Sequence, residues 1–241
     1  MTGTPARGHR TARVFGFAAA AGVLLAGCGS SGSSAPAPGS PAPAAPPGGV
    51  AASVAYQLHM DFFSRESKLS PVIDPQVFLA SPGTPAGTGQ QMIRHVAGVR
   101  PAPKASAPGT ALLGPDGAPL HITAGQWQKA AGRVTVSCRK GAERAVSRLR
   151  GLIPSGSCST FVVHLDVQGP GRFTPWGDPQ GTTNNFTAGA DGAATPSDTV
   201  PGCLGSRAAA VIIWHSDGRP HGPMPGVLGV TWHNSLITPL P

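Results

Sequence analysis

The chain has 241 residues, which is enough for one domain in addition to export and linker segments. Only 12% of its residues are charged, and its 34 glycines and 27 prolines are unevenly spread, which indicates a low-complexity stretch beside a loop-rich domain. The formal charge of +8 at pH 7 comes from scattered basic residues with no interleaved aromatic side chains, and this argues against a nucleic-acid-binding protein.

The N-terminus has the parts of an export signal in the expected order. Arg7, Arg10 and Arg13 precede an apolar run over residues 14–25. This run is too short to remain in a bilayer as a helix, which needs about 20 apolar residues. If the segment is removed, the loss of its three arginines lowers the formal charge from +8 to +5. That remainder is consistent with weak attraction to anionic envelope polymers or lipid head groups, or simply with solvated strand faces.

The four residues Leu25-Ala26-Gly27-Cys28, which begin with the last residue of the apolar run, resemble the lipobox of bacterial lipoproteins, which ends in small residues before a lipidated cysteine. The resemblance implies a signal peptide over residues 1–27, cleavage before Cys28 and acylation of the Cys28 thiol. The expected partner is therefore the membrane, through this lipid, and the expected location is the extracytoplasmic face of the cell membrane.

The segment after the cysteine, residues 29–49, contains only Gly, Ser, Ala and Pro. Such a composition cannot bury enough surface to offset the entropy of ordering, so residues 28–49 are predicted to be a lipidated, disordered tether. Extended polyproline-like chain at about 3.1 Å per residue gives a reach of at most roughly 65 Å. This tether would hold a globular head away from the membrane.

Residues 50–109 form the part of the head for which the sequence predicts least. Ala52 to Phe63 is mildly apolar but follows neither helical nor strand periodicity cleanly, so a strand and a short helix both stay open. Residues 81–109 are rich in Pro, Gly, Ala and Ser apart from residues 90–99, and no regular structure is expected for most of them.

Residues 110–241 are predicted to form an antiparallel β-sandwich, immunoglobulin-like or related, with one short helix. Thr123 and Gln126 have the spacing of a capping box, which predicts a short helix around Trp127. Short β-rich runs separated by turn residues at roughly ten-residue spacing favour the sandwich. The expected strands are residues 133–138, 145–153, 160–167, 208–215 and 227–237.

Alternation within these runs predicts which side chains face the core. The first run should place Val134, Val136 and Cys138 on one face, and the third run should place Phe161, Val163, Leu165 and Val167 inward. The run over residues 208–215 is the most apolar and is expected to be a central strand. Three tryptophans are also expected in the core, at positions 176, 214 and 232.

The stretch from Leu112 to the C-terminus also resembles an uncharacterised secreted bacterial β-sandwich domain. The resembling residues are Gly125-Gln-Trp127, Gly151-Leu-Ile-Pro-Ser-Gly156, Asn184-Asn-Phe-Thr-Ala188 with Asp191-Gly192, and His215-Ser-Asp-Gly218. The resemblance implies a fold and no particular activity.

Three cysteines remain after Cys28, at positions 138, 158 and 203. Because an exported protein lies where disulfides persist, one bridge and one free thiol are expected. If the runs 133–138, 145–153 and 160–167 form a meander, Cys138 and Cys158 lie about 30 Å apart, at opposite ends of a strand. Cys203 should then pair with one of them, and Cys158–Cys203 is preferred because both residues precede apolar strands.

One cluster of side chains suits a metal ion. His215, Asp217, His221 and His233 fall within nineteen residues, with Met224 in the same loop. Imidazoles suit zinc or copper, a methionine favours Cu(I), and an aspartate can orient an imidazole. The alternative is a polar loop between two apolar strands whose histidines are satisfied by backbone or solvent.

No catalytic motif accompanies this cluster: the chain has no Gly-x-Ser-x-Gly elbow, no phosphate-binding loop and no Cys-x-x-Cys. The leading hypothesis is therefore a non-catalytic lipoprotein without a cofactor, which binds another envelope component or has a structural role there. The alternative hypothesis is an extracytoplasmic copper- or zinc-binding protein.

Overall fold

The computed structural model describes residues 51–167 and 172–241, and these belong to one compact unit. The predicted signal peptide, Cys28 and the predicted tether lie outside the described residues. In the part of the chain that is described, no helix is both long enough and apolar enough to cross a membrane.

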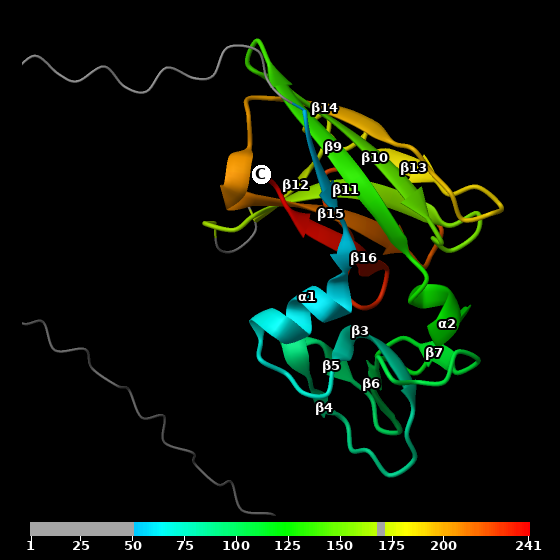
Figure 1. Ribbon diagram of the computed structural model, residues 1–241. Helices are drawn as coiled ribbons and strands as arrows, with labels where there is room; N and C mark the ends of the chain where they lie inside the picture. The colour runs from blue at the N-terminus through cyan, green and yellow to red at the C-terminus, as the bar shows by residue number, and fades with distance from the viewer. Residues whose placement is uncertain (1–50, 168–171) are drawn as a thin grey trace, which may run out of the picture. The chain divides into compact units, whose positions relative to one another are not determined.

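The fold is mainly β and antiparallel, as the sequence predicts, and its centre is a sandwich of two sheets (Figure 1). The first sheet has the strand order β1-β9-β10-β14, and the second sheet has the order β12-β11-β15-β16-β2, with β13 also paired to β11. The strands of the first sheet are β1 (Ala52–Ala55), β9 (Ala131–Arg139), β10 (Ala142–Arg150) and β14 (Ser197–Pro201). Those of the second sheet are β2 (Gln57–Leu58), β11 (Ser157–His164), β12 (Phe173–Pro175), β13 (Asn185–Thr187), β15 (Ala208–His215) and β16 (Trp232–Pro239).

A third sheet is formed by the region for which the sequence predicts least. Its order is β6-β3-β7-β8, and a small β4-β5 pair and the short helix η1 lie in the same part of the chain. The predicted boundary between residues 109 and 110 is therefore wrong, because it separates strands that pair with each other. The elements are β3 (Ile73–Ala80), β4 (Gly87–Thr88), η1 (Gln90–Met92), β5 (Arg94–His95), β6 (Val99–Pro103), β7 (Ala111–Leu113) and β8 (Pro119–Thr123).

Helices occupy three short stretches of the described chain besides η1: α1 (His59–Glu66), α2 (Ala124–Trp127) and η3 (Gly205–Arg207). The capping box predicted for α2 is confirmed, because the Gln126 amide N–H donates to Thr123 Oγ1 and the Thr123 amide N–H donates to Gln126 Oε1. The ambiguous run over residues 52–63 contains both alternatives, with strands first and then α1.

The main core lies between the first and second sheets and extends to the third. Alternate residues of β9, such as Val134 and Val136, pack there with alternate residues of β15, such as Ile212 and Trp214. Leu112 of β7 and Trp127 of α2 belong to the same cluster. The inward positions predicted for Val134 and Val136 are therefore confirmed.

The second sheet is unusual because its outer face is buried as well. All eight residues of β15 are buried, and the side chains that alternate away from the main core form a second cluster. That cluster contains Phe161, Val163, Ala209, Val211, Ile213 and Ile237, and is covered in part by Phe62, Phe173 and Trp232. The prediction that residues 208–215 form a central strand is confirmed. Leu165 and Val167, predicted inward, are instead exposed because β11 ends at His164.

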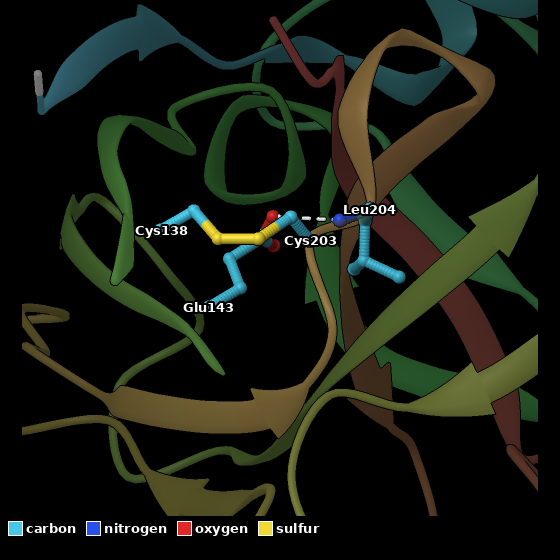
Figure 2. Close-up of a disulfide and its surroundings, with 4 residues drawn as sticks. All are labelled: Cys138, Glu143, Cys203 and Leu204. Atoms are coloured by element: carbon cyan, nitrogen blue, oxygen red, sulfur yellow. Dashed lines mark hydrogen bonds between the residues drawn. A yellow bond between two sulfur atoms is a disulfide. The ribbon is translucent and has the colours of Figure 1, made fainter. Parts of the chain in front are cut away.

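The predicted Cys158–Cys203 bridge is wrong: Cys138 and Cys203 are bonded, with their Cα atoms 5.8 Å apart (Figure 2). The expected meander does not form, because β10 pairs with β14 while β11 pairs with β15 in the other sheet. Cys203 follows β14 at the edge of the first sheet, whereas Cys158 is free and buried in the core. Beside the bridge, the Leu204 amide donates to Glu143 Oε2, and burial raises the pKa of the Glu143 carboxyl (Figure 2).

The bridge spans 65 residues of chain, so its loss is expected to lower the free energy of unfolding by about 2–4 kcal/mol. We predict that a reducing agent destabilises the wild-type chain and Cys158→Ala but leaves the Cys138→Ala/Cys203→Ala double variant unchanged in urea unfolding. Cys158 should resist alkylation in the folded chain, because burial raises the pKa of its thiol to about 12. A non-reducing peptide map that joins Cys158 to another cysteine would contradict this pairing.

Candidate functional site

The structure separates the predicted metal ligands. In the β15–β16 pair, His215 lies opposite Trp232 and His233 lies opposite Trp214. Because successive residues point to opposite faces of a sheet, the two histidines cannot meet across the strands as the sequence suggested. His233 packs beside Trp127 and Trp214 in the main core, and His215 lies on the outer face.

The remaining members of the cluster are close to one another but do not form a metal site. The His215 and His221 rings are 5.2 Å apart, and His221 Nε2 is 3.2 Å from Asp217 Oδ2. Met224 is 55% exposed. Among the described residues, no three His, Cys, Asp or Glu side chains are grouped so that they could hold a metal ion. The metal site predicted from His215, Asp217, His221 and His233 is therefore not supported.

His215 instead belongs to a hydrogen-bond chain with the buried Ser159 and the partly buried Asn185. The Asn185 Nδ2 amide donates to the Gly181 carbonyl oxygen at 2.6 Å, which leaves Asn185 Oδ1 facing Ser159 Oγ at 2.7 Å. Ser159 has one hydroxyl hydrogen, and Asn185 Oδ1 can only accept. The hydroxyl therefore donates to Asn185, and His215 Nε2, 2.6 Å from Ser159 Oγ, carries a hydrogen and donates to the serine.

This polarity is the reverse of that in a serine–histidine catalytic pair, where the imidazole accepts the serine proton. Burial, with a smaller contribution from nearby His221, lowers the pKa of His215 to about 4, so the ring is neutral at pH 7. Its Nδ1 atom is buried and has no hydrogen-bond partner among the described residues. The chain therefore fixes the loop around Asn185 to the second sheet.

A cleft of about 570 Å³ opens over the outer face of the second sheet, within the range of roughly 300–1,000 Å³ typical of small-molecule sites. Its floor and walls are mainly apolar, and Met92 at its edge is 81% exposed. The lining comes from α1, η1, β11, β12, β15 and β16, and from the loop before β16. Its apolar members are Phe62, Phe63, Met92, Val163, Leu165, Phe173, Val211, Leu228, Trp232 and Ile237.

Polar side chains line the same cleft: His59, Gln91, Arg172, Asn234, Glu66 and Ser67. Gln76, which is fully buried in β3, links three of them. Its Oε1 accepts from the backbone N–H of Asn234 at 2.6 Å, and its Nε2 donates to Gln91 Oε1 at 2.9 Å and lies 3.5 Å from His59 Nδ1. The third sheet is thus joined to the second by polar contacts at the cleft.

Sequence reasoning missed this cleft. Its lining residues are spread from His59 to Ile237, with no shared spacing, and Gln91 and Met92 lie in the stretch expected to be largely irregular. Trp232, expected in the core, lies half-buried in the cleft wall and contacts Phe173. The only available signal was the unbroken apolar run over residues 208–215, which implies a strand that needs cover on both faces.

Comparison of the chain with protein-family models, with curated proteins and with solved structures gives no match.

The hydrogen-bond polarity at Ser159 can be measured. We predict that Ser159→Ala lowers the free energy of unfolding by about 1–3 kcal/mol, because it leaves the buried His215 Nε2–H and the partly buried Asn185 Oδ1 without partners. Ser157→Ala, two residues along the same strand, is the matched control and should change stability by less than about 0.5 kcal/mol. Nitrogen-15 NMR should show His215 as the Nε2–H tautomer, and the Nδ1–H tautomer would contradict the assignment.

Proposed function

We propose that the chain is a lipid-anchored protein of the extracytoplasmic membrane face whose β-sandwich head binds a ligand without transforming it. The ligand site is the cleft over the outer face of the second sheet. The observation that carries this proposal is the cleft itself, with a largely apolar lining on a sheet whose outer face is otherwise covered. Ligand apolar surface removed from water there contributes roughly 25 cal/mol per Å².

The non-catalytic part of the proposal is supported by the direction of the hydrogen bonds at Ser159. Its hydroxyl hydrogen is committed to Asn185, so His215 is not placed to take it. Among the described residues that line the cleft, only Glu66 carries a carboxylate, and it pairs with Arg65 at the exposed surface. The described part of the lining therefore holds no pair of carboxylates that could act as general acid and base.

The anchoring part of the proposal is supported by the lipobox-like sequence that ends at Cys28. If residues 28–49 act as the tether that their composition predicts, the head stays within a short distance of the bilayer, which raises the effective concentration of membrane-derived ligands at the cleft. An apolar site and a lipid anchor are therefore consistent with one role, the binding of a molecule that is released from or delivered to the envelope.

The anchor is tested by metabolic labelling with an alkyne-tagged fatty acid. We expect the wild-type chain and the control Cys158→Ala to carry the label and Cys28→Ser to lack it, because Cys28 is the proposed acylated residue. Label that persists in Cys28→Ser, or a wild-type chain without label, would contradict the anchor.

The cleft is tested with dibromooctadecanol, an uncharged long-chain alcohol whose bromines quench nearby tryptophan. In the full chain carrying Cys28→Ser, we expect saturable quenching of Trp232, the tryptophan that lines the cleft. Val211→Phe should reduce probe affinity at least about tenfold by filling the floor, since lost burial of a few methylenes at about 0.8 kcal/mol each is sufficient. Val227→Phe is the matched control, because Val227 is 61% exposed and lies outside the cleft lining. Quenching that does not saturate, or that Val211→Phe leaves unchanged, would contradict a ligand site in the cleft.

A further inference from the structure

The polar groups of the cleft have a fixed hydrogen-bond direction, set by one backbone amide. The Asn234 N–H can only donate, and it donates to Gln76 Oε1 at 2.6 Å. This contact fixes the orientation of the Gln76 side-chain amide, so Nε2 is the atom that faces Gln91 Oε1 at 2.9 Å and His59 Nδ1 at 3.5 Å. Both neighbours therefore act as acceptors toward Gln76.

The free atoms of these two neighbours are consequently donors. Because Gln91 Oε1 accepts from Gln76, the remaining polar atom of Gln91 is its NH₂ group. Because His59 Nδ1 faces a donor, its ring hydrogen lies on Nε2. Burial lowers the pKa of His59 to about 4, so the ring is neutral at pH 7 with one donor and one acceptor. Within the described residues neither of these two free groups has a hydrogen-bond partner, and both residues line the cleft.

Asn234 repeats the same pattern on β16. Its Oδ1 accepts from Trp232 Nε1 at 2.6 Å, so its free atom is the Nδ2 amide, again a donor. Arg172 adds a guanidinium, which has donors only, and its Nε atom is buried with no partner among the described residues. Glu66, the acid that lines the cleft, has a side chain that is 58% exposed and pairs with Arg65 at 3.3 Å. It therefore supplies no acceptor to the donors of His59, Gln91 and Asn234.

A cleft with several hydrogen-bond donors and few acceptors favours a ligand that supplies acceptors. A donor that becomes covered by an apolar ligand loses its water and costs free energy unless the ligand supplies an acceptor. Carboxylates and phosphates present only acceptors when ionised, and they make the shorter, stronger hydrogen bonds of charged pairs. The positive charge of Arg172 adds electrostatic complementarity to an anion.

We infer that the cleft binds a single-chain anionic amphiphile, with its carboxylate or phosphate head accepting hydrogen bonds from His59, Gln91 and Asn234 beside Arg172. The apolar chain lies along the outer face of the second sheet, against Phe62, Val211 and Ile237. This inference rests on the proposed function and specifies the ligand class for the same cleft.

The test uses the full-length protein with Cys28→Ser and compares two brominated probes with hydrocarbon chains of equal length. Dibromostearate has a carboxylate head, and dibromooctadecanol has an uncharged hydroxyl. We expect the carboxylate to bind at least about tenfold more tightly, as charge-assisted hydrogen bonds imply. Gln91→Glu keeps the oxygen that accepts from Gln76 and replaces the free NH₂ group by a charged oxygen. This substitution should lower the affinity for dibromostearate at least about tenfold and change the affinity for dibromooctadecanol by less than about twofold.

Gln90→Glu is the matched control, since it makes the same change at the exposed neighbouring residue, outside the cleft lining. It should leave the affinity for both probes within about twofold, because exposed charges are well screened. A second variant, Arg172→Gln, should also lower the affinity for dibromostearate more than the affinity for dibromooctadecanol. Thermal unfolding of each variant shows whether it is folded.

Each outcome separates the head-group inference from the proposed function. If both probes bind equally and Gln91→Glu affects neither, the head-group inference is overturned while the apolar ligand site stands. If neither probe gives saturable quenching, the proposed function fails as well. If Gln90→Glu weakens dibromostearate as much as Gln91→Glu does, general surface charge explains the preference and the inference is overturned.

Discussion

The structure depends on a sheet that must be kept from water on both faces. Every residue of β15 is buried, and its side chains alternate between two separate apolar clusters. A two-layer sandwich covers one face only. The other face of this sheet needs a cover that the first sheet cannot supply, and the rest of the chain is arranged to supply it.

That cover is assembled from short pieces that are far apart in the sequence. Phe62 comes from α1, Phe173 from β12 and Trp232 from the end of β16. Short pieces do not interdigitate as two full sheets do, so they leave a gap, and the gap is the cleft. The proposed ligand site therefore results from how the second face is covered and needs no dedicated binding motif. For this reason no sequence motif marks the cleft.

Sequence reasoning succeeded where local patterns decide the structure. The alternation of residues 133–138, the apolar run of residues 208–215 and the capping box at Thr123 all depend on near neighbours, and all were predicted correctly. Residues 50–109 were harder because β3 pairs with both β6 and β7, which come later in the chain, and because Pro and Gly weaken the local signal.

The errors at the site and at the disulfide have one common cause, which is pairing between distant segments. A change of one position in the pairing of β15 with β16 moves a side chain to the opposite face of the sheet, which decides whether His215 and His233 meet. Likewise, Cys203 is bonded to Cys138 because β10 pairs with β14 and not with β11. The polar network around Gln76 joins β3, η1 and β16, so no local pattern could reveal it.

The buried, unpaired Cys158 also bears on how the chain reaches its oxidised state. Three thiols remain after Cys28, so a reduced chain has three ways to form one bridge. Disulfides form by thiolate attack and need an accessible thiol. The Cys158 thiol becomes inaccessible to this reaction when β11 pairs with β15 and buries it. In an oxidising compartment, the Cys138–Cys203 bridge is therefore favoured when the second sheet assembles before the thiols react. An earlier bridge through Cys158 would be incompatible with the buried core position that this cysteine holds in β11.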